Sequence, residues 1–430
     1  MAERLLITGG LVIDPGQNLE AVRDVLLENG KVAKVAAGLS RQAAFKDART
    51  LDAHGAWVTP GLIDMHVHLR EPGRESDETI ATGTSAAALG GFTTILAMPN
   101  TEPVIDNPSL VRFLKAKAAA EGVVNVLFSG AITLGQKGER LTDFRKLKNE
   151  GVCALTDDGR PVMNSEVMRR AMEYAKDNDL LLIDHCEDCN LSGSGAINDG
   201  RAATAKGVRG IPPAAETVMV LRDIALCQLT GARVHIAHLS AAGSVDAVRQ
   251  AKKRGLPVSA EAAPHHFSLC DDDIPGYDAN FKMNPPLRGS ADRQALLEGL
   301  ADGTIDAIAT DHAPHGEGKK SLGLGLAPFG VIGLETSLGL GLTRLVGKKI
   351  LTRKQLIDKM SGAPARLLGL KTKGGLKVGM DADVTVIDPS TSWKVADFAS
   401  KSRNSPFLGA TLKGRAQATI VAGKIVHHAL

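Results

Sequence analysis

The stretch GLIDMHVHLREPG, residues 61–73, joins a short apolar run to a group of polar side chains. The apolar part has the length and composition of a buried β-strand. Because side chains alternate across a strand, His66 and His68 project to the same side near its end. Arg70 follows two residues later in the same register. A buried strand that ends in two imidazoles predicts a chemical site at the carboxyl edge of a sheet.

Further apolar runs follow this strand and alternate with helical patterns. The candidate strands are GLIDMHVH (61–68), TTILAMPN (93–100), VNVLFSGAI (124–132), VCALTDD (152–158), LLLIDHCE (180–187), RVHIAHLS (233–240), PVSAEAAPHH (257–266) and IDAIATDHAPH (305–315). Amphipathic segments lie between most of them, at 107–120, 164–178, 214–229, 242–254 and 291–301. This alternation predicts an α/β fold, a (β/α)8 TIM-type barrel over residues 59–375. A doubly wound open sheet is the second candidate, because periodicity alone does not exclude it.

Both chain ends show a different sequence pattern, in which short strand-like runs are separated by glycine, asparagine and aspartate. RLLITGGLVID and VLLENGKVAKVAA lie near the start, and GMDADVTVIDP and ATLKGRAQATIVAGKIV lie near the end. The sequence ENGK at 28–31 is a strong signal for a two-residue hairpin turn. We expect residues 1–58 and 376–430 to form one small β-sandwich domain together.

The composition excludes several classes of protein. Lys and Arg total 51 against 48 Asp and Glu, and a net charge of +3 does not indicate a nucleic-acid or membrane-surface partner. No apolar run is long enough for a membrane span, and the N-terminal stretch has no targeting signature. Five cysteines without a framework spacing fit a reducing compartment. We therefore expect a cytoplasmic protein, and the single CxxC of Cys186 and Cys189 is a weak indication of metal or redox chemistry.

Polar residues end five of the predicted barrel strands, where reactive groups of such barrels gather. These residues are His66 and His68, the pair Asp157-Asp158, His185, His238 and Asp311. Each would need a partner if buried, since an unsatisfied buried polar group costs about 1–3 kcal/mol. A divalent metal ion satisfies all of them together. Nitrogen and oxygen ligands of this kind suit Zn²⁺, with Mn²⁺, Co²⁺ or Fe²⁺ as alternatives.

The other histidines fit this pattern less well. His235 lies three residues before His238, so we expect it on the opposite side of its strand in a structural role. His265 and His266 end the seventh strand, and neither is assigned to the site. Three histidines fall in the small β-domain and are expected to be structural: His54, His427 and His428.

The motifs together resemble one protein family over nearly the whole chain. GLIDMHVHLREPG, AMPNT, ALTDDGRPV, DHCED, HIAHLS, APHHF, KMNPPLR and ATDHAPH occur in this order. The set is similar to that of the bacterial class I dihydroorotases of the amidohydrolase superfamily. The resemblance implies interconversion of N-carbamoyl-L-aspartate and L-dihydroorotate in pyrimidine biosynthesis.

The resemblance also implies a role for each metal ligand. By motif, His66 and His68 match ligands of the more buried metal, and His185 and His238 match ligands of the second metal. Asp311 matches the residue that is both a ligand and the general acid/base. A hydroxide held between the metals is then the expected nucleophile.

The substrate-binding residues follow from the same motifs. Arg70 and Asn100 match residues that hold the carboxylate of the substrate, and Asn284 and His315 match further substrate contacts. An arginine suits this task because its planar fork binds a carboxylate through two hydrogen bonds.

One position departs from the wider superfamily. Many binuclear members bridge their metals with a carbamylated lysine on the fourth strand, but here that strand reads GVCALTDDG and has no lysine. A carboxylate is therefore expected to bridge, and by motif register it is Asp158, with Asp157 as the alternative. One or two Zn²⁺ ions per subunit fit this ligand set.

Other functions stay open. A related cyclic-amide hydrolase, such as an allantoinase or hydantoinase, is the nearest alternative. A non-catalytic scaffold for aspartate transcarbamoylase is another, although such chains lose metal ligands that are present here. We expect a homodimer or larger assembly, with aspartate transcarbamoylase as a candidate partner. The glycine- and lysine-rich segment 315–330 is expected to close over the substrate.

Overall fold

The computed structural model describes residues 4–429 and contains a parallel barrel. Its strands pair in chain order: β6 (Leu62–Val67), β7 (Phe92–Ala97), β8 (Asn125–Gly130), β9 (Ala154–Leu155), β10 (Leu181–Asp184), β13 (Val234–Ile236), β14 (Val258–Ala262) and β15 (Ala307–Ile308). The sheet closes where the His68 N–H donates to the carbonyl of His312 at 2.8 Å, just after β15. The predicted barrel is therefore confirmed, since an open doubly wound sheet would leave its first and last strands apart.

Helices cover the outside of the barrel. They are α1 (Ile80–Leu89), α2 (Pro108–Glu121), α3 (Phe144–Asn149), α4 (Ser165–Asp177), α7 (Ala214–Thr230), α8 (Ala242–Lys253), α10 (Ser290–Asp302) and α13 (Leu334–Leu340). Helix α4 shows why they form where they do. The Asn164 side chain accepts hydrogen bonds from the N–H groups of Glu166 and Val167 and so caps the helix. One face of the helix then carries the residues that it buries: Met168, Ala171, Met172 and Ala175.

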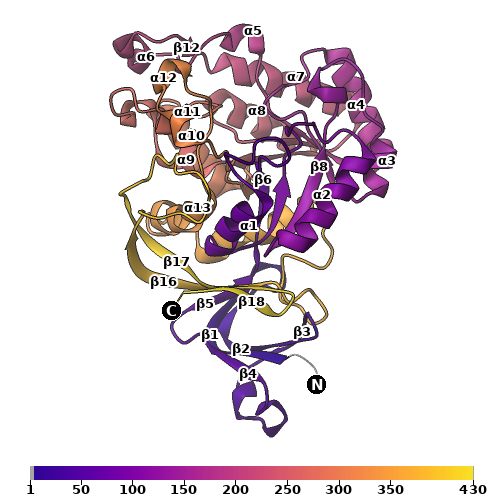
Figure 1. Cartoon of the computed structure of the whole chain (residues 1–430), viewed down its shortest axis with the longest axis vertical. Helices are drawn as coiled ribbons and strands as arrows, with labels where there is room; N and C mark the ends of the chain where they lie inside the picture. Colours follow the sequence, from indigo (N-terminus) through magenta and orange to yellow (C-terminus); the bar gives the residue numbers. More distant parts are fainter. Residues whose placement is uncertain (1–3, 430) are drawn as a thin grey trace.

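Strands from both chain ends make a second sheet below the barrel (Figure 1). It contains β1 (Arg4–Asp14), β2 (Leu19–Glu28), β3 (Lys31–Ala36), β4 (Arg49–Asp52), β5 (Trp57–Pro60), β16 (Val384–Lys394), β17 (Thr411–Val421) and β18 (Lys424–His428). Strand β1 branches, because Leu5–Thr8 pair with β4 while Leu11 and Val12 pair with β5. Strands far apart in the sheet order, such as β3 and β17, share one apolar core.

Short elements connect the larger ones. Helices α14 (Arg353–Ile357) and α15 (Ala363–Leu367) follow α13, while α9 (Pro264–Ser268) follows β14. The remaining short elements are α5 (Cys189–Ser192), α6 (Arg201–Lys206), α11 (Glu317–Lys320), α12 (Gly323–Leu326) and the paired strands β11 (Ile197–Asn198) and β12 (Gly210–Ile211). Figure 1 shows these remaining elements gathered on the barrel away from the small sheet. Within residues 4–429, no helix has both the length and the apolar character needed to cross a membrane.

Candidate active site and metal centre

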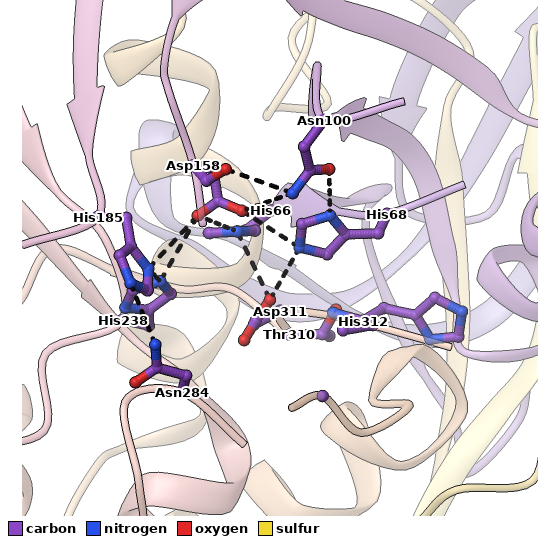
Figure 2. Close-up of polar contacts among 12 residues, drawn as sticks. His66, His68, Asn100, Asp158, His185, His238, Asn284, Thr310, Asp311 and His312 are labelled. Carbon is purple, nitrogen blue, oxygen red and sulfur yellow. Dashed lines mark hydrogen bonds and ion pairs between the residues drawn. The ribbon is translucent and has the colours of Figure 1, made fainter. Parts of the chain in front are cut away.

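Asp158 lies at the centre of a buried cluster at the carboxyl end of the barrel strands (Figure 2). Its Oδ1 atom is 3.2 Å from His66 Nε2, and its Oδ2 atom is 3.4 Å from His68 Nε2. On the other side, His185 Nδ1 and His238 Nε2 each lie 3.7 Å from Asp158 Oδ1. The carboxylate of Asp158 therefore stands between two pairs of imidazoles.

Asp311 completes this cluster. Its Oδ1 atom is 3.2 Å from His68 Nε2 and 3.5 Å from His66 Nε2. The structure thus brings together all six residues that the motifs predict as metal ligands, from five barrel strands or the turns that follow them.

Left-handed backbone turns aim several of these side chains. Arg70, His238 and Asp311 have φ values of 60°, 29° and 48°, in a region that residues other than glycine rarely adopt. Each residue lies just beyond a barrel strand, where the chain turns away from the sheet. Such conformations cost about 1–3 kcal/mol each and are characteristic of functional sites.

Asp157 faces away from the cluster. Its Oδ1 atom accepts hydrogen bonds from the backbone N–H groups of Ile132 at 2.8 Å and Thr133 at 3.1 Å, and its Oδ2 atom accepts one from the Thr133 hydroxyl. Of the two neighbouring aspartates, only Asp158 has its carboxylate among the histidines.

The cluster suits a metal ion. His66 Nε2 and Asp158 Oδ1 are buried atoms without a hydrogen-bond partner among the described residues, although they face one another. Burial opposes charge on His66, yet the carboxylates of Asp158 and Asp311 raise the pKa of its imidazole well above the usual value. Ligand atoms of two triads, His66–His68–Asp311 and His66–Asp158–His238, lie within 4.8 Å of one another. These imidazoles and carboxylates are the donors that Zn²⁺ prefers.

A cavity of about 370 Å³ opens beside the cluster. Nine of the sequence-predicted site residues line it: His68, Arg70, Asn100, Asp158, His185, His238, Asn284, Asp311 and His315. His66 lies below them and is fully buried.

Neighbouring groups hold the polar side chains of the cavity in place. Arg70 Nε donates to the carbonyl of Pro314 at 3.1 Å, and Arg70 Nη2 is 3.3 Å from His315 Nε2. Asn100 Oδ1 lies 2.9 Å from His68 Nδ1. The cavity therefore combines a buried guanidinium with the metal-binding cluster.

Glu187 is a site residue that the motif analysis did not assign. Its Oε2 atom is 3.1 Å from His185 Nε2 and accepts a hydrogen bond from Asn284 Nδ2 at 2.8 Å. This contact leaves Nδ1 of His185 facing Asp158. Burial opposes charge on His185, but Glu187 and Asp158 raise the pKa of its imidazole to about 9.

Glu261, in the middle of β14, was missed as well. Its two oxygens lie 3.1 Å from His66 Nδ1 and 3.1 Å from His235 Nε2. His235 Nδ1 is in turn 2.8 Å from Ser259 Oγ. Glu261 therefore connects His235 to a predicted metal ligand, and the structural role expected of His235 stays a prediction.

The remaining candidates do not line the cavity. His266 Nε2 lies 2.8 Å from the carbonyl of Pro285, and His265 is buried against His266. Cys189 is exposed, whereas the buried Cys186 lies near Asp184 and Asp223. Arg222 forms ion pairs with both of these carboxylates, so a metal ion is not needed there. The two cysteines of the CxxC do not share an environment.

Comparisons with known proteins place this fold and site in a class. Residues 55–244 match the family model described as Dihydro-orotase-like, and residues 229–427 match that of the Amidohydrolase family. Both family models describe amidohydrolases, so the fold and the candidate metal centre define this chain as a hydrolase of that class.

Similar proteins narrow the class to a family. A dihydroorotase of Pelotomaculum thermopropionicum is 53% identical, with 98% of each chain covered, and one of Geotalea daltonii is 52% identical over 98% of this chain and 99% of its own. Among solved structures, L-hydantoinase of Arthrobacter aurescens has a TM-score of 0.89 at 25% identity, covering 100% of this chain and 96% of its own. Dihydropyrimidinase of Brevibacillus agri has a TM-score of 0.87 at 26% identity, covering 99% and 95%. The chain belongs to the dihydroorotase family of the amidohydrolases.

Proposed function

We propose that this chain is a dihydroorotase that interconverts N-carbamoyl-L-aspartate and L-dihydroorotate in pyrimidine biosynthesis, in the cytoplasm. The observation that carries the proposal is the cavity in which a six-residue ligand cluster meets the buried Arg70. A substrate with both a carboxylate and a hydrolysable ring amide suits these two features together.

His66, His68 and Asp311 would hold one Zn²⁺ ion, and His185 and His238 would hold a second, with Asp158 between them. Bound zinc would act as a Lewis acid. It would polarise a carbonyl and lower the pKa of a water molecule, which could then lose a proton and attack near neutral pH. Glu187 and Glu261 accept from the far nitrogens of His185 and His66, which leaves the near nitrogens free to act as ligands.

Arg70 would orient the substrate through its α-carboxylate. The Pro314 carbonyl accepts from Arg70 Nε and fixes the guanidinium at the cavity wall, and a fixed planar fork recognises a carboxylate through two parallel hydrogen bonds. Asn100 adds a neutral amide beside it, and Asn284 and His315 are the further contacts that we assign to the substrate.

Asp311 would move the proton. In the hydrolytic direction, its carboxylate accepts a proton from the attacking water and then delivers it to the departing ring nitrogen. In the biosynthetic direction the same carboxylate takes the proton from the ureido nitrogen and delivers it to the leaving hydroxyl group, which departs as water.

The alternatives fit less well. Hydantoinases share the fold, yet β9 and its following turn offer Asp158 where many binuclear relatives use a lysine, and the buried Arg70 favours an acidic substrate. A non-catalytic scaffold would not need its predicted ligands to converge, as they do in this cluster. A homodimer or larger assembly and a complex with aspartate transcarbamoylase are also part of the proposal.

The test is an assay of the zinc-loaded protein with L-dihydroorotate, hydantoin, allantoin and dihydrouracil, together with elemental analysis. We expect turnover of L-dihydroorotate alone and one or two zinc ions per chain. Preferred turnover of an uncharged ring would identify a different cyclic-amide hydrolase. Adding aspartate transcarbamoylase, with light scattering to determine mass, tests the proposed assembly.

A further inference from the structure

Two lysines beside the cavity wall are buried without an ion-pair partner among residues 4–429. Lys282 is 4% exposed and Lys320 is 7% exposed, and neither has a carboxylate within 4.0 Å. Burying an ammonium group is costly unless its N–H groups find acceptors. Their position next to the site therefore needs an explanation.

Backbone carbonyls accept hydrogen bonds from the ammonium group of Lys320. Its Nζ atom, at the end of α11, donates to the carbonyls of Lys282 at 3.1 Å, Pro328 at 3.0 Å and Gly330 at 2.9 Å. Three acceptors match the three N–H donors of an ammonium group. One side chain thus joins two segments that are distant in sequence.

Lys282 makes the reciprocal connection. Its Nζ atom donates to the carbonyl of Gly325 at 3.2 Å and lies 4.6 Å from the centre of the Phe329 ring. Its own carbonyl also accepts from the Gly330 N–H at 3.0 Å. We call Lys282, Lys320 and residues 328–330 the lysine latch.

Part of the lysine latch lines the cavity. Pro328, Phe329 and Gly330 line the cavity, and the carbonyl of Phe329 lies 2.7 Å from His315 Nε2. Gly330 has a φ of 130°, and a Cβ atom there would lie only 3.0 Å from His315 Nε2. Asn284, the other substrate contact that we assign, follows Lys282 by two residues.

We propose that Lys320 is a positioning residue, which holds the wall at 328–330 against the loop of Asn284 and so shapes the substrate-binding face. The proposal rests on the proposed function, because it concerns the same cavity. An anionic substrate would reinforce the latch, since it offsets two neighbouring buried cations. Burial and the nearby Lys282 lower the pKa of Lys320 to about 7, so such an anion would favour the charged, three-donor form.

The experiment compares Lys320→Met with Lys319→Met in the zinc-loaded enzyme. Lys319 lies on the same helix and pairs with Asp77 at 2.6 Å, so its substitution removes an equal charge without touching the latch. We expect Lys320→Met to raise KM for dihydroorotate about tenfold, because it removes hydrogen bonds from a charged donor, with a kcat change below about threefold. Hydrogen exchange in the peptide 326–332 should also become faster, while Lys319→Met leaves that exchange unchanged.

Unchanged KM and exchange in Lys320→Met, or equal effects of the two substitutions, would overturn the proposal. If Lys320→Met does not fold, Lys320→Gln replaces it, since its amide retains two donors and should give an intermediate KM and exchange rate. If the wild-type protein does not turn over dihydroorotate, the proposed function fails on its own. The exchange rate at 326–332 in Lys320→Gln against wild type then still decides whether Lys320 holds the wall.

Discussion

The carboxylate of Asp311 lies on a turn with left-handed backbone and faces both histidines of the β6 end. It is 6% exposed, at the boundary between the buried cluster and the cavity. A group in that place lies against the predicted metal ligands His66 and His68 and also lines the cavity in which we propose that the substrate binds. This is why the proton-transfer role is assigned to it.

Replacing Asp311 with asparagine should remove turnover. The amide cannot accept a proton, so kcat should fall about a thousandfold, while substrate binding is largely retained. Steady-state kinetics and equilibrium binding of carbamoyl aspartate measure the two effects, with zinc content determined in parallel. Wild-type kcat in this variant would remove Asp311 from the acid/base role.

Replacing Arg70 with lysine should impair substrate capture. A lysine keeps the positive charge but loses the planar fork, so KM for dihydroorotate should rise about 10- to 100-fold with a smaller change in kcat. Kinetics on both substrates measure this split. An unchanged kcat/KM would show that Arg70 does not bind the carboxylate.

Replacing Glu261 with glutamine should weaken zinc binding. The amide can accept from only one of His66 and His235, so the tautomer of His66 is no longer fixed, and metal affinity should fall about 10- to 100-fold. Chelator competition measures the affinity. Glu335→Gln is the matched control, because Glu335 accepts from the backbone N–H groups of Ala399 and Ser400, outside the cluster. Equal zinc affinities in the two variants would contradict a role for Glu261.

For single residues of the site, the sequence predicted those at the ends of strands better than those within strands. His66, His185 and Asp311 follow apolar runs, so their polarity stands out at a predictable edge. Glu261 lies inside a buried strand, and only the structure shows that it meets His66 and His235. A single acid in the run PVSAEAAPHH was a signal, but it did not specify a partner.

Among the elements, the barrel strands were the easiest to predict. Strands such as β6 and β7 are buried along their whole length, which produces continuous apolar runs. Helix α1 was missed because alanine, glycine and threonine replace a clear apolar stripe. Most of its residues are buried, and it packs against α13 and β17. Its small residues therefore allow close packing on several sides, and it lacks the polar, solvent-exposed face of an amphipathic helix.

Removing the cap of α4 should destabilise the barrel without affecting chemistry. The Asn164 side chain accepts from two N–H groups at the start of this helix, so Asn164→Ala should lower the free energy of unfolding by about 1 kcal/mol. Urea unfolding of the zinc-loaded protein measures the loss. Asn164→Ser should retain most of the stability, and kcat should stay at the wild-type value in both. Equal losses for alanine and serine would exclude capping as the cause.

For the whole molecule, metal binding and folding should be linked. The cluster joins the first strand of the barrel to the turn after the last, through His66 and Asp311. Zinc at about 100 times its dissociation constant would therefore add about 2.7 kcal/mol to the stability of the folded chain. Chelation should abolish activity and lower Tm, and added Zn²⁺ should restore both. A Tm that does not respond to zinc would show that zinc does not bind preferentially to the folded chain.

The branched sheet has a consequence for how the protein is made. Thr59 on β5 donates a hydrogen bond to Thr385 on β16, although 326 residues separate them. A ribosome needs on the order of tens of seconds to add that length of chain. During this time the growing polypeptide displays an unpaired β edge, which invites pairing with another nascent copy. A chaperone that covers this edge until β16 is made should therefore increase the recovered yield.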